Sequence, residues 1–457
     1  MVRAGAEAEG PGAGRPSAQC APRGRPAPTA LREDRPDAVG RDPRPGPGPA
    51  AEHGLGPAPV PDPARIDADV TAAVGQVLDA LLSDRLAEAA RVDALFRQDV
   101  AGRIADFTLH GGRRRRSQFL WWGFRACGGG ADPLRVAACL RIGACLELIQ
   151  TCALVHDDVM DGSRRRRGRP AVHASFDSAY VAAPPAPTGV PFGVSAAILA
   201  GDLALVWADD SFALTPLPGG AARAVGRLWR AMRTEMVAGQ YLDVHAQAVA
   251  SRSSSRAMRA AYLKTALYSA ERPLALGAAL ADAGHARTRA LRSAGRCAGL
   301  AFQLRDDLAG IFGAEEDTGK AAGEDVRAGK ASYPLAVARL RARSQDDHRA
   351  LAVLDDCIGA GGGLTADGLA RVRDVLTTTG TRAAVERRIA RLVAQGLRHV
   401  ARAEPAPGTE LRLRALMREA AGVPSAGSEG PPAQAAAPGG GGAAAGRAGQ
   451  RTGGTHS

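Results

Sequence analysis

The sequence predicts an all-α protein folded as a single large helical bundle. Between about Ala64 and Gly422 the chain is rich in Ala, Leu and Arg and poor in the β-branched and aromatic runs that mark strands. No internal repeat with a period of roughly 20 to 50 residues is found, which excludes a solenoid. This length suits one helical domain around one hydrophobic core.

The two ends of the chain differ in composition from this region. Residues 1–62 are mostly Ala, Gly, Pro, Arg and acidic residues, and residues 424–457 are rich in Gly and Ala. Neither end has enough large apolar side chains to offset the entropy lost on ordering. We therefore expect disordered tails at 1–62 and 424–457 on either side of a folded domain at 63–423.

Helical periodicity and Gly, Pro or Asp breakers divide the domain into successive helices. The segment after Asp161 is expected to be a plain helix stop, and four prolines between residues 182 and 192 predict a surface connection. The expected helices are residues 66–82, 84–107, 133–160, 193–214, 219–248, 255–283, 286–313, 333–343, 346–358, 365–379 and 381–402.

Charge and cysteine content restrict the class of protein. The formal net charge is +12 at pH 7, but aromatic residues are not interleaved with the basic ones. We therefore expect an anionic small-molecule ligand and no nucleic acid partner. Seven cysteines without a Cys-x-x-Cys pair indicate buried thiols in a reducing compartment. No leader segment is found, and Asp202 interrupts the longest apolar stretch, so we expect a cytoplasmic protein without a membrane span.

The clearest chemical signal is an acidic cluster at the end of an apolar helical segment, HDDVMD at residues 156–161. Asp157 and Asp158 precede Asp161 by four and three residues, so the three carboxylates converge on one helix face. They repel one another at the negative end of the helix dipole unless a cation lies between them. Mg²⁺ uses such oxygen ligands together with substrate phosphates. The alternative for this cluster alone is a solvated acidic helix end.

A second acidic pair, Asp306 and Asp307, follows Gln303 in another apolar helical segment. If the two helices run side by side, five carboxylates face one cavity that would hold several Mg²⁺ ions and a diphosphate. Taken alone, the pair would be an exposed helix face beside Arg305.

Basic residues occur in positions that suit two separate diphosphates. Four arginines at 113–116 follow a Gly-Gly turn, and four more at 164–167 follow the first acidic cluster. Guanidinium groups match phosphate oxygens in geometry. Lys264, followed by Thr265, and Lys330 add point charges near the second acidic pair. Either arginine run alone is more often a surface patch or a nucleic acid contact.

In this order, the residues resemble the trans-isoprenyl diphosphate synthase family, most like its geranylgeranyl diphosphate synthases, over roughly residues 64–420. The first aspartate-rich motif of that family, with its trailing Arg-Arg-Gly-x-Pro, is matched by Asp157, Asp158, Asp161, Arg166, Arg167, Gly168 and Pro170. Other matches are Gln150, Gly239-Gln240 with Asp243, Lys264-Thr265, Phe302-Gln303 with Asp306-Asp307, and Gly329-Lys330. The resemblance implies a helical bundle of the isoprenoid synthase type with a central active-site cavity.

Three features depart from the family pattern. Arg113 replaces the lysine of Gly-Gly-Lys-Arg-x-Arg-Pro, and Gly310 stands where the second motif usually has a third aspartate. Metal binding there would rest on Asp306 and Asp307, with weaker turnover as a possible cost. The two tails have no counterpart in the family.

The resemblance also implies the reaction and its residues. Isopentenyl diphosphate would condense with dimethylallyl, geranyl or farnesyl diphosphate in a homodimeric enzyme, with about three Mg²⁺ ions per site. The implied metal ligands are Asp157, Asp158, Asp161, Asp306 and Asp307, with Lys264, Thr265 and Gln303 completing the catalytic set. The implied substrate contacts are Arg166, Lys264, Thr265, Gln303 and Lys330 for the allylic diphosphate and Arg113, Arg116, Gln150 and Arg167 for isopentenyl diphosphate.

Product length should depend on the side chains below the first acidic motif. A helical turn rises about 5.4 Å, close to one isoprene unit, so Cys152 and Ala153 form the first possible floor of the product tunnel. Bulky aromatics there stop growth at the farnesyl length in this family, and both side chains are small here. Leu148 and Ile149 would form the next floor. We expect geranylgeranyl diphosphate, with longer polyprenyl diphosphates as the alternative.

Three other classes of protein compete with this interpretation. A class I terpene cyclase shares the fold and the first motif, but it uses an Asn/Asp-Ser/Thr-Glu metal triad that this sequence lacks. A non-catalytic regulatory subunit usually loses its acidic motifs, whereas this chain departs only at Gly310. A nucleic-acid-binding protein would show strongly salt-dependent binding through its arginine runs.

Overall fold

Several helices begin at a capping side chain that the sequence supplies. Asp132 caps the helix that carries the first acidic cluster by accepting a hydrogen bond from the Leu134 amide, and Pro133 occupies the first turn. That helix ends at Gly162, whose φ of 66° places it in the left-handed region that glycine adopts without strain. Asp347 and Thr365 cap later helices in the same way.

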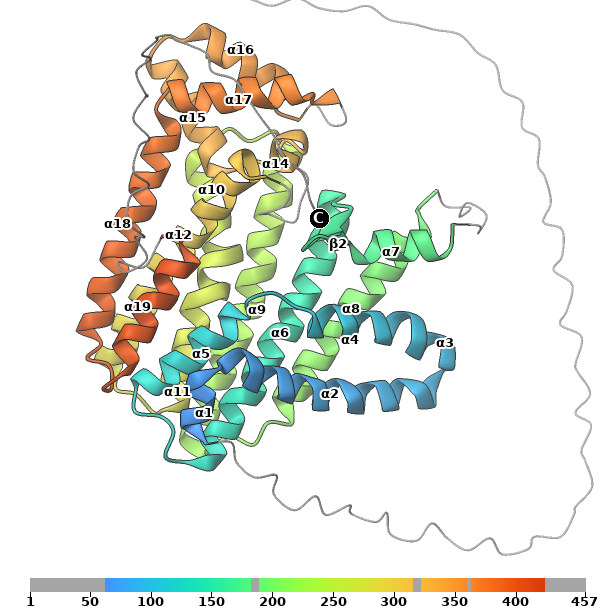
Figure 1. Ribbon diagram of the computed structural model, residues 1–457, viewed down its shortest axis with the longest axis vertical. Helices are drawn as coiled ribbons and strands as arrows, with labels where there is room; N and C mark the ends of the chain where they lie inside the picture. The colour runs from blue at the N-terminus through green and yellow to red at the C-terminus, as the bar shows by residue number, and fades with distance from the viewer. Residues whose placement is uncertain (1–61, 182–188, 315–321, 360–362, 424–457) are drawn as a thin grey trace, which may run out of the picture. The chain divides into compact units, whose positions relative to one another are not determined.

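The computed structural model describes residues 62–181, 189–314, 322–359 and 363–423, all within the compact unit Pro57–Ser457 (Figure 1). Apart from Asp62, the expected tails lie outside the described residues. In chain order the elements are α1 (Pro63–Ala68), α2 (Val70–Val92), α3 (Ala94–Phe96), η1 (Arg97–Ala101), α4 (Gly102–Leu109), α5 (Arg115–Ala126), α6 (Pro133–Asp161), β1 (Arg165–Arg166), β2 (Arg169–Pro170), α7 (Val172–Ala179), α8 (Phe192–Ala213), α9 (Gly219–Ala248), α10 (Ser254–Ala261), η2 (Tyr262–Glu271), α11 (Arg272–Leu280), α12 (His285–Phe312), α14 (Glu324–Arg327), α15 (Tyr333–Ser344), α16 (His348–Cys357), α17 (Ala366–Thr378), α18 (Thr381–Arg402) and α19 (Thr409–Ala420).

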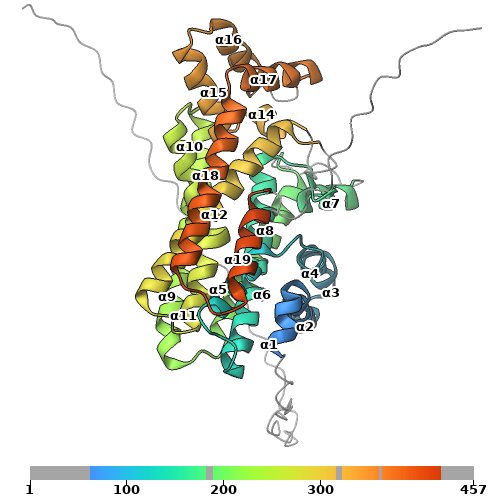
Figure 2. The ribbon, with the colours of Figure 1, turned by 60° about the vertical axis from the view of Figure 1, so that its left-hand side comes forward.

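The fold is all-α, as predicted, and its helices surround the site. Helix α6 packs on α8, α12 packs on α18 and on the π-helical segment η2, and α5 packs on α11. Figures 1 and 2 show α6, α9 and α12 running lengthwise through the bundle. One large apolar cluster forms the core, and a smaller one lies among α15, α16 and α17. The core is rich in alanine, so helix axes approach closely where the site is built.

Most of the expected helices are present with their ends shifted by two residues or fewer, but several expectations were wrong. The break expected at Ser83 does not exist, because α2 continues to Val92 and the chain turns at Asp93. The helix expected at 255–283 is three consecutive segments, with the π-helix η2 in the middle. Sequence reasoning missed α5, α7, α14 and α19, the first because its arginine-rich start looks like a loop.

The segment after Asp161 is more than the plain helix stop expected from the sequence. Strands β1 and β2 pair antiparallel, with Arg165 opposite Pro170 and Arg166 opposite Arg169. The two turn residues, Arg167 and Gly168, both have positive φ, at 54° and 75°, as a tight hairpin turn requires. The hairpin therefore fixes the positions of Arg166 and Arg167 relative to the end of α6.

Two helices, α6 and α8, are long and apolar enough to cross a membrane by length and composition. In α6, 78% of the most apolar window is buried inside the protein, so those side chains belong to the core of the bundle. In α8 the buried share is 44%, and Ile198, Leu199 and Val206 are exposed. Core helices of soluble proteins meet the same criteria, so no membrane span follows.

Candidate active site

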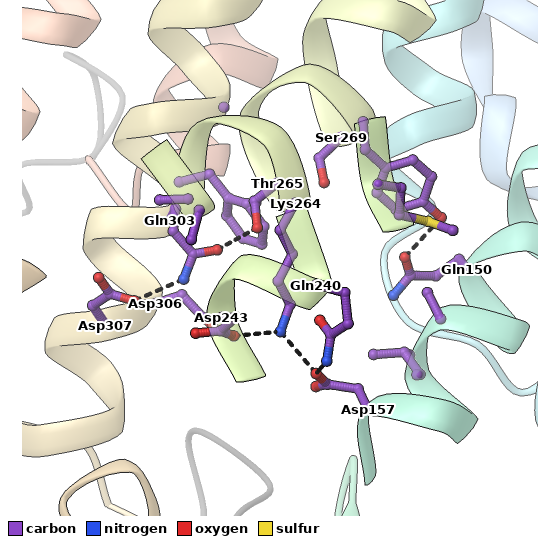
Figure 3. Close-up of a pocket in the computed structure, with 18 of the residues that line it drawn as sticks. Gln150, Asp157, Gln240, Asp243, Lys264, Thr265, Ser269, Gln303, Asp306 and Asp307 are labelled. Atoms are coloured by element: carbon purple, nitrogen blue, oxygen red, sulfur yellow. Dashed lines mark hydrogen bonds and ion pairs between the residues drawn. The ribbon is translucent and has the colours of Figure 1, made fainter. Parts of the chain in front are cut away.

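A large cavity of about 1640 Å³ lies in the middle of the bundle, between α5, α6, α9, η2, α12 and α14. Asp157, Asp306 and Asp307 line it together with Lys264 and Lys330. Figure 3 shows Asp157 on one side of this cavity and Asp306 and Asp307 on the other. Asp157 therefore faces Asp306 and Asp307 across one space, whereas Asp158 and Asp161, which were also expected to face it, are not among the lining residues.

The carboxylates of the first motif are held by cations. Arg166 donates from Nε to Asp158 at 2.8 Å and from Nη2 to Asp157 at 3.3 Å. Asp158 is fully buried behind the cavity wall, and Asp161 accepts a hydrogen bond from Lys330 Nζ at 3.2 Å. Of the three aspartates, Asp157 faces the cavity directly.

Lys264 connects the first motif to the opposite wall. Its Nζ donates to Asp157 at 2.8 Å and to Asp243 on α9 at 2.9 Å, and Gln240 adds a hydrogen bond to Asp157 at 3.1 Å (Figure 3). Burial would lower the pKa of Lys264, but the neighbouring carboxylates outweigh burial and raise it. For Asp157 burial has the opposite effect and would raise the pKa. Lys264, Lys330 and Arg166 outweigh burial and hold the pKa of Asp157 well below its usual range. These groups are ionised at neutral pH.

Gly239 allows Lys264 to reach this position. A Cβ at residue 239 would lie 2.2 Å from the backbone nitrogen of Lys264, so no larger residue fits at this crossing of α9 and η2. Gly299 on α12 makes a similarly close approach to Ala266. The π-helical η2 is therefore packed tightly on both sides, and it presents Lys264 and Thr265 to the cavity.

The second motif is bound to η2 by amide and hydroxyl groups. Gln303 donates from Nε2 to Asp307 at 2.7 Å and accepts a hydrogen bond from Thr265 at its amide oxygen. Burial raises the pKa of Asp307 to about 7, with Asp325 and Asp306 adding to the rise and the Gln303 hydrogen bond opposing it. Burial is the main cause of this rise, so the Asp307 carboxylate lies in a poorly solvated part of the site.

The donor set fits magnesium. Within the described ranges, no three His, Cys, Asp or Glu side chains are already gathered in metal-binding geometry, because Lys264, Lys330 and Arg166 hold the first motif. Carboxylate oxygens of Asp157 nevertheless line the cavity on one side, and those of Asp306 and Asp307 line it on the other. A divalent cation such as Mg²⁺ takes carboxylate oxygens as ligands, so this donor set suits it.

The arginines from α5 and the hairpin form a second, basic region of the same cavity. Arg113, Arg115, Arg116 and Arg167 all line it. Arg116 donates to Ser269 at 2.8 Å and lies over the Tyr268 ring, and the Nε atoms of Arg115 and Arg116 are buried without an acceptor among the described residues. Burial lowers the pKa of Arg115 and of Arg167, with further lowering from neighbouring arginines. These arginines therefore have fewer anionic partners within the described residues than their charge could bind.

Gln150 and the chain-length residues lie on α6 below the first motif. Gln150 accepts a hydrogen bond from the Tyr268 hydroxyl at 3.0 Å and lines the cavity. Cys152 and Ala153 also line it, as expected of a first floor. Leu148 and Ile149 are fully buried in the core and are not among the lining residues, so the second floor remains a prediction.

Several residues of the cavity were not predicted from the sequence. Arg115 and Tyr268 lie beside predicted residues, but no spacing distinguishes them from their neighbours. Arg114, in the same arginine run, pairs with the buried Glu147 at 3.7 Å, and both residues line the cavity. Asp325 on α14 reaches the second motif from a separate element, which no local pattern indicates.

The sequence profile described as polyprenyl synthetase matches residues 98–359. The chain belongs to the polyprenyl synthetase family. The family expected from the motifs is therefore confirmed. Within this family, the chain is 32% identical over 247 residues to a short chain isoprenyl diphosphate synthase of Methanothermobacter thermautotrophicus, which covers 53% of this chain and 68% of that protein.

Other relatives differ in the product that their names give. A (2E,6E)-farnesyl diphosphate synthase of Mycobacterium bovis is 32% identical over 60% of this chain and 69% of its own length. A geranylgeranyl diphosphate synthase of Mycobacterium tuberculosis is 35% identical over 51% of this chain and 60% of its own length.

Among solved structures, a geranylgeranyl pyrophosphate synthase from Corynebacterium glutamicum, complexed with isoprenyl diphosphate and magnesium, is also similar. Its TM-score is 0.72 at 36% identity, and the match covers 76% of this chain and 97% of that one. The bundle of this polyprenyl synthetase family member is therefore of the isoprenoid synthase type, as predicted.

Proposed function

We propose that the protein is a magnesium-dependent trans-prenyltransferase that condenses isopentenyl diphosphate with an allylic diphosphate. The observation that carries the proposal is one cavity in which two acidic motifs face each other beside a separate group of arginines. The family and the names of its relatives, which are geranylgeranyl, farnesyl and short chain isoprenyl diphosphate synthases, support it. A cyclase has no second diphosphate for Arg113, Arg116 and Arg167 to bind.

The five aspartates of the two motifs would hold about three Mg²⁺ ions. Bound there, magnesium supplies positive charge that stabilises a departing diphosphate. Lys264 and Lys330, released from carboxylates that accept a metal, are positioned to neutralise the same diphosphate, and Arg166 keeps Asp157 and Asp158 oriented.

The reaction needs no protein nucleophile. The allylic C–O bond breaks, and diphosphate leaves with the electron pair. The double bond of isopentenyl diphosphate then attacks the allylic carbon, and the released diphosphate takes up the proton that is lost. The hydrogen-bonded oxygens of Thr265 and Gln303 line the cavity and would stabilise the allylic cation.

Isopentenyl diphosphate would occupy the basic region. Arg113, Arg116 and Arg167 would bind its diphosphate, and the buried pair Gln150 and Tyr268 would fix Arg116 and the wall beside it. Burial is the main cause of the lowered pKa of Arg167, and neighbouring arginines lower it further, so a bound anion would relieve the repulsion between these guanidinium groups.

We propose geranylgeranyl diphosphate as the product. Cys152 and Ala153 on the cavity wall leave room beyond the farnesyl length. Relatives named for both lengths have similar identity to this chain, so the side chains of the floor support this choice more strongly than the names do.

The enzyme is proposed to be a cytoplasmic homodimer. Helix α8 exposes Ile198, Leu199 and Val206 at 45%, 64% and 53%, a row of apolar side chains that a second copy would cover. The six cysteines within the described residues are all free thiols, which suits a reducing compartment.

The deciding experiment incubates purified protein with Mg²⁺, isopentenyl diphosphate and, separately, dimethylallyl, geranyl and farnesyl diphosphates. We expect geranylgeraniol after dephosphorylation, detected by mass spectrometry, and no product from Asp157→Ala. Alcohols longer than geranylgeraniol would support the same reaction but indicate that the floor of the product tunnel lies deeper. No product from any primer with folded protein would contradict the proposal, and a cyclised hydrocarbon would favour a terpene cyclase.

A further inference from the structure

The glycine that replaces the third aspartate of the second motif is not next to empty space. Gly310 follows Asp306 by four residues on α12, so the two positions share a helix face directed to the cavity. A Cβ built at residue 310 would lie 2.3 Å from Oδ2 of Asp325 and 3.7 Å from its Cβ. The carboxylate of Asp325 therefore occupies the space above Gly310.

Asp325 comes from another element but lies among the same charges. It is on α14, lines the cavity, and its side chain is 16% exposed. One of its oxygens lies 3.6 Å from Lys330 Nζ, which also binds Asp161 of the first motif at 3.2 Å.

The backbone around Asp325 fixes its position. The Lys330 amide donates to the Asp325 carbonyl at 2.9 Å, and the Gly359 amide donates to the Val326 carbonyl at 3.0 Å. Val326 is fully buried in the apolar cluster of α15 to α17. These contacts anchor the short helix α14, so its acidic side chain is directed toward α12.

We propose that Asp325 supplies the third carboxylate of the second acidic motif, reaching the site from α14 over Gly310. The glycine is then an adaptation that admits Asp325, because a side chain at residue 310 would collide with it. This inference rests on the proposed function of the cavity, and it predicts an intact set of acidic ligands where the sequence indicates a loss.

The first test measures metal binding without turnover. Calorimetry would follow the binding of inorganic diphosphate as a function of Mg²⁺ concentration in the wild type and in Asp325→Asn. The isosteric change removes the charge, and we expect the Mg²⁺ requirement to rise by about 10- to 100-fold. The matched control is Asp356→Asn, an exposed carboxylate on α16 that pairs with Arg371, and it should leave binding unchanged.

A carboxylate exchange separates this role from simple neutralisation of Lys330. Gly310→Asp alone should lower the melting temperature of the protein, because the new side chain meets Asp325. The double variant Gly310→Asp, Asp325→Gly moves the carboxylate to α12 and removes the collision. We expect it to recover Mg²⁺-dependent diphosphate binding to within about threefold of wild type.

Two results would overturn the inference. One is wild-type Mg²⁺ dependence in folded Asp325→Asn, and the other is a folded double variant that binds no better than Asp325→Asn. If the single variant does not fold, as judged by circular dichroism, the double variant alone decides. Asp157→Asn tests the site itself: if it keeps full Mg²⁺-dependent binding, the proposed function fails, whereas a loss there with unchanged Asp325→Asn rejects only the role of Asp325.

Discussion

At the scale of single residues, the cations of this site are in place before any ligand arrives. Lys264 lies between Asp157 and Asp243, and Lys330 lies between Asp161 and Asp325. Each lysine is partly buried, and the carboxylates around it raise its pKa although burial would lower it. The positive charges are therefore preorganised, so little reorganisation is needed when a diphosphate develops negative charge.

Lys264→Gln should lower kcat/KM by about 10²- to 10³-fold, because it removes one preorganised charge at the leaving group. Steady-state kinetics with farnesyl diphosphate would measure the effect. Arg259→Gln, an exposed cation on the preceding helix, is the matched control and should be neutral. Equal activities of the two variants would contradict a role for Lys264 at the leaving diphosphate.

Asp307→Asn should stabilise the metal-free protein at alkaline pH while abolishing turnover. The pKa of Asp307 is raised to about 7 from an ordinary value of 3.8, so between these values the unfolded chain binds fewer protons and the free energy of unfolding falls as pH rises. At pH 8 the variant should exceed the wild type by up to about 4 kcal/mol, and at pH 4 by much less. Urea unfolding in chelator would measure both; a difference independent of pH would count against the prediction.

How far the sequence predicts the site also depends on individual residues. The acidic motifs, Lys264 and Lys330 could be predicted, because their spacing along one helix or motif carries the chemistry. Asp325 could not, because its approach to Gly310 depends on how α14 packs. A missing aspartate in a motif therefore does not reveal whether another element supplies the charge.

At the scale of elements, predictability follows the capping residues. Helices α6, α9 and α12 were predicted with ends within one residue, since Pro, Gly and Asp mark them. Helix α5 begins at a positive-φ Arg114 within an arginine run, so sequence reasoning found no start signal. The π-helical geometry of η2 was not predicted from the sequence, and the segment packs closely against α9 and α12.

The crossing of α9 and η2 gives a prediction for these elements. Gly239→Ala places a methyl group against the Lys264 backbone, so it should destabilise the protein by about 1–3 kcal/mol and displace Lys264, with a loss of activity. The matched control is Gly226→Ala in the same helix. A Cβ at residue 226 would lie 4.0 Å from Arg230 Nη1, an ordinary van der Waals contact. This control should stabilise by up to about 1 kcal/mol.

Denaturant unfolding and activity assays on both variants would check this pair. The prediction fails if Gly239→Ala and Gly226→Ala unfold at the same denaturant concentration, or if Gly239→Ala is less stable but keeps full activity per folded molecule.

At the scale of the whole molecule, the apolar face of α8 predicts association. Leu199→Glu should convert the proposed dimer to a monomer, because one charge on each copy would be buried in the contact. Light scattering coupled to size-exclusion chromatography measures the mass. Leu340→Glu on α15 changes an equally exposed leucine, at 60%, and should leave the mass unchanged. A wild-type monomer, or a variant that stays dimeric, would contradict the proposal.

The fold class and the placement of the cavity were predictable at this scale because motif order fixes them. The Gly-Gly turn precedes α5, and the two acidic motifs lie on α6 and α12, which line one cavity. Sequence reasoning placed residues 409–420 in the folded domain but predicted no helix there, so it missed α19, whose last residues line the cavity.

The scarcity of lysine makes the active site unusually easy to observe by spectroscopy. The chain has only three lysines, and both of those in the described residues, Lys264 and Lys330, bind carboxylates in the cavity. Protein labelled with ¹⁵N at lysine alone would give three backbone amide signals, two of them from the proposed active site. Titrating substrate analogues into such a sample would report on occupancy residue by residue, without mutation and without crowding from the rest of the bundle.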